Sequence, residues 1–166
     1  MQSIIRNLPI KSFNNLEIPK DKPCLILGKG PSFNKISEVN LDNYFIIGLN
    51  QVCKFIECDI GHFIDAEILT QSFVTNSKKI LCPIYPHINY RATSLLAYYY
   101  IEPYKNKLEK LYCYNASTWK KKLVESLGQI IKVKYFSAEA VFRILGIKGI
   151  TEIYTLGIDG GTQYAD

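Results

Sequence analysis

The sequence predicts an α/β fold, namely a Rossmann-like three-layer domain with a mainly parallel sheet. The main observation is that short apolar runs rich in β-forming residues alternate with helical or loop segments. A second is that these runs stop at glycine or at polar residues, where a turn or a helix would begin. The 166 residues, 48% hydrophobic and 21% charged, suit one globular domain with a packed core.

The first element of the predicted sheet is residues 24–27, a short apolar run that stops at Gly28, Gly30 and Pro31. Comparable runs predict strands at 44–49, 60–64, 79–82, 111–114, 130–135 and 150–158. Helices are expected over 118–127, ended by Gly128, and from Ser137 to the glycines at 146 and 149. Residues 1–22 lack periodicity and are predicted to be a leader that packs across a domain of residues 23–166, outside its central sheet.

Tyrosines and prolines crowd residues 83–104, so the local structure of this segment is ambiguous. Tyrosines in such a segment either pack in the core with their hydroxyl groups at its surface or form a wall that faces a substrate. The sequence leaves both interpretations open.

The sequence indicates a cytoplasmic protein. Its apolar stretches are shorter than the ~18 to 20 residues of a membrane span, and its start, MQSIIRNLPIKSF, lacks the apolar segment of a secretory signal. The five cysteines are odd in number and form no CxxC pair or zinc-ligand spacing, which predicts reduced, mostly buried thiols. A position at the inner face of the membrane stays open.

The formal charge of +5 is mild and comes largely from the lysine-rich residues 102–134. No zinc-finger, helix-turn-helix or RNA-binding pattern accompanies these lysines, so nucleic acid is not an expected partner. A solvated helical face is the favoured interpretation. Attraction to a phosphate-bearing substrate, or peripheral association with an anionic membrane surface, is the alternative.

Residues that directly follow the predicted strands are the candidates for function, because ligands of open α/β sheets bind beyond the carboxyl ends of the strands. Four such groups share one rim in this prediction, and they are residues 28–32, Asn50 with Gln51, Asp65, and Asp159 with Gly160 and Gly161.

The glycines of GKGPS, residues 28–32, allow the backbone to approach a ligand closely. Free amides and the Ser32 hydroxyl could cradle a phosphate or a ribose, and Lys29 could supply charge. The alternative is a plain turn. The motif is neither GxGxxG, since residue 33 is Phe, nor a P-loop, so nicotinamide cofactors and Walker-type hydrolysis are disfavoured.

Three further polar residues on this rim each have two interpretations. Asn50 suits a base edge or a sugar hydroxyl, or it simply forms a turn. Asp65 is slightly favoured as a helix cap, and a ligand-facing carboxylate with weak divalent-metal binding beside Glu67 is the alternative. Asp159, which precedes two glycines, is predicted to grip a sugar or to act in catalysis.

Two histidines are present, and they are the side chains that titrate near neutrality without help. His62 falls inside a predicted strand and is expected to be structural. His87, in the aromatic segment, is the better candidate for a general base, although a structural loop histidine is favoured over that role.

Three segments, LILGKGPSF, FIIGLNQV and SAEAVFRILGIKGITEIYTLGIDGG, occur in an order that resembles the bacterial sialyltransferases of glycosyltransferase family 42. That family has a G-x-G-P-S turn after its first strand, an Asn-Gln pair after the next, a helix led by serine, and a strand that ends in G-I-D. A related group, the motility accessory factors and the 6-hydroxymethylpterin pyrophosphokinase-like proteins, shares the glycine turn and the last strand but fits Asn50-Gln51 less well.

The resemblance implies that Gly28, Gly30, Ser32 and Asn50 hold the CMP part of a nucleotide-sugar donor. Ser137 corresponds to the serine that leads the family's helix, and Tyr164 is similar in position to a tyrosine that contacts the donor phosphate. Gly160 and Gly161 stand where that family has aromatic residues, so the safer inference is a nucleotide-sugar donor of unspecified kind. The family's catalytic histidine lies beyond this point, and no residue of this chain matches it.

The function expected from the resemblance is that of a nucleotide-sugar-binding domain in a glycosyltransferase of surface polysaccharide or lipopolysaccharide synthesis. The partners would be a nucleotide-sugar donor and a glycan or glycolipid acceptor, with no cofactor or metal because the family uses tyrosines at the phosphate and no DxD motif occurs. The short stretch after Asp159 suggests a fragment, with another glycosyltransferase domain following. The alternatives are a non-catalytic nucleotide-binding module and a Mg²⁺-dependent pyrophosphokinase-like enzyme.

Overall fold

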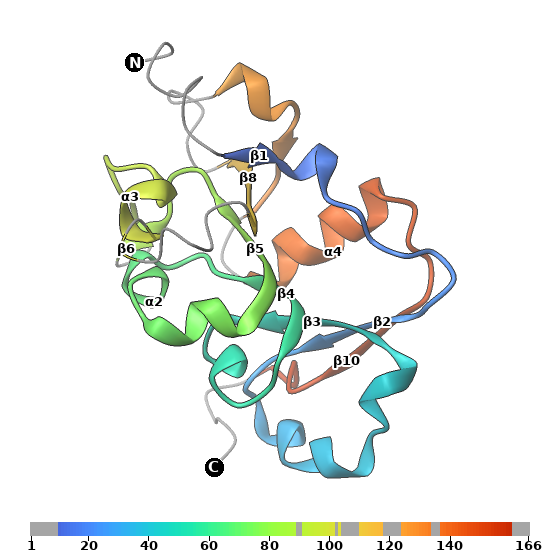
Figure 1. The fold of residues 1–166 in the computed structure, drawn as a ribbon. Helices are drawn as coiled ribbons and strands as arrows, with labels where there is room; N and C mark the ends of the chain where they lie inside the picture. Colours follow the sequence, from blue (N-terminus) through green and yellow to red (C-terminus); the bar gives the residue numbers. More distant parts are fainter. Residues whose placement is uncertain are drawn as a thin grey trace.

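A computed structural model describes residues 10–88, 91–101, 103, 110–117, 124–133 and 137–160 (Figure 1). It confirms the predicted α/β fold: an eight-stranded sheet has the strand order β1-β8-β5-β4-β3-β2-β10, with β9 beside β8. Every pairing in this sheet is parallel. Strands β2 to β5 follow one another in sequence, whereas β10 returns to the other side of β2, so the strand order reverses there.

The strands agree closely with the sequence prediction where that prediction rested on apolar runs. The strand β2 has the predicted bounds, whereas β10 and β9 are shorter than predicted because only part of each run pairs with a neighbour. The strands of the large sheet are β1 (Lys11–Ser12), β2 (Cys24–Leu27), β3 (Phe45–Leu49), β4 (Cys58–His62), β5 (Ser77–Pro83), β8 (Leu111–Ala116), β9 (Ile130–Ile131) and β10 (Ile153–Leu156). A separate hairpin joins β6 (His87–Ile88) to β7 (Arg91–Ala92).

The prediction that residues 1–22 stay outside the sheet is wrong for two residues. Lys11 and Ser12 pair with Tyr112 and Cys113 and so form the edge strand β1. The Ser12 hydroxyl also donates to the carbonyl of Leu127, 3.0 Å away. Residues 11 and 12 thus contact residues more than a hundred positions away in the sequence. No local sequence pattern indicates such contacts.

Most of the helical segments are short 3₁₀ turns that connect the strands. The predicted helix over 118–127 is described only in part: residues 118–123 lie outside the described residues, and 125–127 form a 3₁₀ turn ended by Gly128. The 3₁₀ segments are η1 (Phe13–Asn15), η2 (Pro31–Glu38), η3 (Leu41–Asn43), η4 (Asn50–Lys54), η5 (Ser72–Asn76) and η8 (Glu125–Leu127), and the α-helices are α2 (Ala66–Leu69), α3 (Ala97–Ile101) and α4 (Ser137–Ile147).

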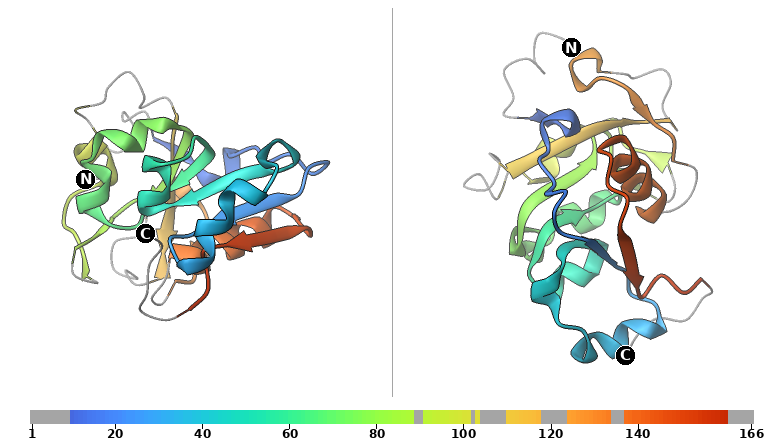
Figure 2. Two further views of the ribbon diagram at one scale, coloured as in Figure 1. Left: turned by 90° about the horizontal axis from the view of Figure 1, so that it is seen from below. Right: turned by 90° about the vertical axis from the view of Figure 1, so that its right-hand side faces the viewer.

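Both faces of the sheet are covered by apolar packing, as the sequence of β2 requires. Leu25 and Leu27 belong to a core cluster that includes residues of η2, η4, α2 and α3. Cys24 and Ile26 point to the opposite face, where α4 and the segment around Phe13 pack. Figure 2 shows these layers from two further directions. A strand that is buried on both faces has a continuous apolar sequence, and β2 could be predicted for this reason.

The tyrosine-rich segment contributes to the core, although one of its described tyrosines stays exposed. Tyr85 is buried, and Tyr98 and Tyr100 pack against the cluster on the side of α3. Tyr99 is exposed. For these residues the structure supports core packing over a substrate-facing wall. The cysteines are free and buried, as predicted.

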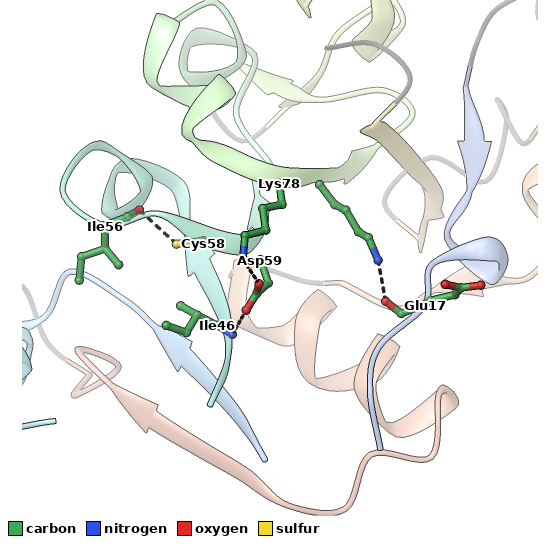
Figure 3. Close-up of polar contacts among 7 residues, drawn as sticks. Glu17, Ile46, Ile56, Cys58, Asp59 and Lys78 are labelled. Atoms are coloured by element: carbon green, nitrogen blue, oxygen red, sulfur yellow. Dashed lines mark hydrogen bonds and ion pairs between the residues drawn. The ribbon is translucent and has the colours of Figure 1, made fainter. Parts of the chain in front are cut away.

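One carboxylate joins three neighbouring strands at the start of β4 (Figure 3). Asp59 Oδ2 accepts a hydrogen bond from the backbone amide of Ile46 in β3, at 2.9 Å, and Oδ1 lies 2.8 Å from Lys78 Nζ in β5. Ile46 is buried, whereas the Lys78 side chain is 61% exposed. The bond to Ile46 therefore matters more to stability than the ion pair, because water cannot replace it as easily.

We expect Asp59→Ala to lower the free energy of unfolding by about 2 kcal/mol, since a buried amide loses its charged acceptor. Lys78→Ala is the matched control. It removes the ion pair and leaves the bond to Ile46, so its cost should stay below about 1 kcal/mol. Urea denaturation of both variants measures the difference, and equal costs would show that the ion pair, not the Ile46 bond, is the important contact.

Candidate functional site

The candidate site is the rim formed by the loops that follow the carboxyl ends of five adjacent strands. In the order β10, β2, β3, β4 and β5 of the sheet, these loops carry Asp159, the glycine turn of residues 28–32, Asn50, Asp65 and His87. The rim includes the reversal of strand order at β2, which is where open α/β sheets form a crevice for ligands. The described strand-end residues that the sequence singled out thus lie along one edge of the sheet.

The glycine turn and the loop after β10 dock directly against each other. The amide of Gly28 donates to the carbonyl of Leu156 at 2.8 Å, and that of Gly30 donates to Gly157 at 2.7 Å. In return, the Gly157 amide donates to Ser32 Oγ at 2.8 Å. A Cβ on Gly28 would overlap the backbone of Gly157, so the close approach that these glycines permit is to another loop of the chain.

Asp159 holds the first turn of η2. Its Oδ2 accepts from the backbone amide of Ser32 at 2.8 Å, and it lies so close to Gly30 that a Cβ there would come within 2.5 Å. Hydrogen bonds from the Ser32 hydroxyl and from its amide lower the pKa of the Asp159 carboxyl below its ordinary value. Asp159 is therefore an ionised acceptor that occupies the position an anion would take at this turn.

The prediction of free amides around a phosphate is wrong for three residues of this turn. The amides of Gly28, Gly30 and Ser32 all donate to acceptors within the protein. With a carboxylate already bound there, a second anion at the same position would be repelled. The turn suits a hydroxyl-bearing ligand group, such as a ribose or a sugar, which can donate to Asp159.

Positive charge lies beside the turn, over an exposed aromatic ring. Lys29 Nζ is 5.5 Å and Lys54 Nζ 5.8 Å from the centre of the Phe55 ring, which is 56% exposed. Phe33 packs on the inner side of Phe55, with ring centres 6.5 Å apart. Both lysine side chains are long enough to turn their ammonium groups toward an anionic group of a ligand on this part of the rim.

Asn50 is the first residue of η4 and lies in the left-handed region, with φ of 50°. It is the one non-glycine residue among the described ones with a positive φ, and such a conformation is several-fold enriched in Asn. Its Oδ1 accepts from the amide of Ile64 at 3.4 Å, while its Nδ2 donors have no partner among the described residues. Gln51 follows it and is exposed.

Asp65 and His87 are brought side by side by a parallel backbone bridge, in which the amide of His87 donates to the carbonyl of Ile64 at 2.7 Å. Burial, with a smaller contribution from Glu67, raises the pKa of Asp65, and burial lowers that of His87. Asp65 is the N-cap residue of α2, as the sequence favoured, but its side chain makes no capping hydrogen bond. His87 is buried and uncharged near neutrality, and can accept a proton.

Ser137, the first residue of α4, reaches the rim through a contact that sequence reasoning missed. Its Oγ lies 2.6 Å from Nδ1 of His62, the last residue of β4. Nε2 of the same ring lies 2.9 Å from the hydroxyl of Tyr114 in β8. His62 is structural in the sense predicted, since it is fully buried, but it also supports a residue predicted to bind ligand. A polar residue at the end of an apolar strand was the available signal.

Two of the predicted residues, Tyr164 and Gly161, lie outside the described residues, whereas Gly160 is exposed with φ of 70°.

Among the described residues, no group of three or more His, Cys, Asp or Glu side chains could hold a metal ion. No helix in the described part of the chain is long and apolar enough to cross a membrane. Fold and rim together define a doubly wound α/β domain with a candidate ligand site at its strand ends. No protein-family model and no curated protein sequence matches this chain.

Proposed function

We propose that this chain is the nucleotide-sugar-binding domain of a bacterial glycosyltransferase of the sialyltransferase-like kind, acting in surface polysaccharide or lipopolysaccharide synthesis. One observation carries the proposal: the segments in which the sequence resembles that family lie side by side at the reversal of strand order. The glycine turn and the G-I-D loop, distant in sequence, touch there through four hydrogen bonds.

The chemistry of the rim supports a ligand that carries both hydroxyl and anionic groups. Asp159 is an ionised acceptor suited to a ribose or sugar hydroxyl. Lys29 and Lys54 supply positive charge for a phosphate, and the Nδ2 donors of Asn50 suit an acceptor on a base or a sugar. A nucleotide-sugar has all of these groups within one molecule.

The reaction we propose is displacement of the nucleotide by a hydroxyl of a glycan or glycolipid acceptor. The new bond forms between the acceptor oxygen and the sugar, the bond from sugar to phosphate breaks, and the nucleotide leaves with its electron pair. A general base must take the proton of the hydroxyl. His87 is the candidate on this chain, because it follows β5 on the same rim and lies beside Asp65.

The first test is binding of CMP, UDP, GDP, ADP and ATP, with and without Mg²⁺, measured by thermal shift and calorimetry. We expect a metal-independent shift with at least one nucleotide, because a ligand that binds the native state alone stabilises it. If none of the five nucleotides causes a thermal shift or a calorimetric signal, the proposed function is refuted. Binding of ATP that requires Mg²⁺ would instead favour a pyrophosphokinase-like enzyme.

Replacing Asn50 should localise this binding. We expect Asn50→Gly to weaken nucleotide affinity about tenfold, since one hydrogen bond contributes about 1 to 1.5 kcal/mol. Glycine keeps the positive φ of this position without strain, so the loss reports the side chain. Asn43→Gly is the matched control and should bind like the wild type, because Asn43 is exposed and ends η3, before the start of β3 and so away from the rim. Equal affinity of both variants would remove Asn50 from the site.

A further inference from the structure

Three side chains from three distant segments form a hydrogen-bonded row beneath the rim. Ser137 Oγ, the His62 ring and the Tyr114 hydroxyl follow one another at 2.6 and 2.9 Å. His62 and Tyr114 are fully buried, and their rings stack with centres 5.8 Å apart at an angle of 16°. Ser137 is only half-buried, so the row begins in the core and ends at the carboxyl edge of the sheet.

The direction of the protons in this row follows from the partners of each atom. The Tyr114 hydroxyl needs an acceptor for its proton, and among the described residues its hydrogen-bond partner is Nε2 of His62. With Nε2 as that acceptor, the neutral ring carries its proton on Nδ1 and donates it to Ser137 Oγ. The serine proton cannot point back at His62 and must be donated elsewhere.

Burial supports the neutral state of this ring, because it lowers the pKa of His62 to about 3. A charged imidazole would donate from both nitrogens, and Tyr114 would then keep its own proton without an acceptor in the core. The same burial makes His62 a poor general base for Ser137, since it disfavours the imidazolium that proton transfer would form. The row is therefore built to orient a hydroxyl and not to activate a nucleophile.

We propose that His62 and Tyr114 are positioning residues that hold Ser137 as a hydrogen-bond donor to an acceptor oxygen of the bound nucleotide. This inference rests on the proposed function. Ser137 lies at the first turn of the eleven-residue helix α4, where the serine donor and the positive end of the helix dipole both favour an oxygen with negative charge. Without Tyr114, the ring can adopt its other tautomer and the serine can turn its proton inward.

A double-mutant cycle with CMP as the probe tests this arrangement. We expect Ser137→Ala to weaken CMP affinity about tenfold, as the loss of one hydrogen bond to a charged group implies. Tyr114→Phe should weaken it about threefold if about a third of the molecules keep the donor orientation. In the Ser137→Ala background, Tyr114→Phe should cause no further loss. Equal loss in both backgrounds would mean a merely structural tyrosine and would overturn the inference.

Tyr112→Phe is the matched control, because it removes a hydroxyl two residues earlier on the same strand and should leave CMP affinity unchanged. The nitrogen chemical shifts of the His62 ring in the wild-type protein give a readout that does not depend on the ligand. We expect a protonated Nδ1 and an unprotonated Nε2 at pH 7, and the opposite tautomer would overturn the inference. If the tautomer is as expected but none of the five nucleotides binds, the proposed function is refuted, and the ligand role of Ser137 with it. The hydrogen-bonded row would then still stand.

Discussion

Gly157→Ala is expected to lower the free energy of unfolding by about 3 kcal/mol. About 1 to 2 kcal/mol comes from placing a side chain at a left-handed φ, here 73°. About 1 to 3 kcal/mol more comes from overlap, because the new Cβ would meet the carbonyl of Gly28. The two loops would have to separate, and with them the hydrogen bonds that join residues 28–32 to the end of β10.

Two other glycines separate these causes in urea denaturation. Gly160 has a similar φ of 70° but no atom within 4 Å of an added Cβ, so Gly160→Ala should cost about 1 kcal/mol. Gly146 lies inside α4 with open space around it, and Gly146→Ala should stabilise the protein by about 0.5 to 1 kcal/mol. If Gly157→Ala costs no more than Gly160→Ala, the two loops do not pack as closely as described.

Acid is expected to destabilise the protein through His62. The folded-state pKa, about 3, lies below the ordinary 6.5, so between these values the unfolded chain binds a proton that the folded chain does not. Stability contributed by the neutral ring is complete above pH 6.5 and is lost as the pH falls toward 3. Relative to pH 7, the loss from this group alone is about 2 kcal/mol at pH 5.

The variant His62→Gln isolates this effect from that of the carboxylates. It should be less stable than the wild type at pH 7, where it loses the contacts to Ser137 and Tyr114, but the gap should narrow as the pH falls to 5. A gap that stays constant from pH 7 to 5 would contradict the expected titration. The ring signals of His62 in the wild-type protein give a second measurement, and they should not titrate between pH 7 and 5.

The sequence was sufficient to predict the parallel sheet and the edge at which the candidate residues lie. Strand β2 is buried on both faces, so its four residues form an uninterrupted apolar run that stops at a glycine. The residues after β2, β3, β4 and β10 could be assigned to one rim because parallel strands end at the same edge. These are local patterns or consequences of topology, and both can be read along one chain.

The 3₁₀ connections and the edge strand β1 could not be predicted in the same way. A two-residue strand such as Lys11–Ser12 exists only because β8 offers it an unpaired edge. No pattern in the sequence predicts that Asp59 accepts a hydrogen bond from the Ile46 amide. That bond depends on how β3 and β4 are offset.

By itself, the sequence determined most strands of the sheet, the residues at their carboxyl ends and the family resemblance that these residues carry. Only the tertiary structure decided what those residues touch. The amides of the glycine turn bind the loop after β10, and Ser137 meets a histidine 75 residues away. The physical reason is that hydrogen bonds act over about 3 Å. Packing brings such distant residues within that range, and local periodicity does not record which ones will meet.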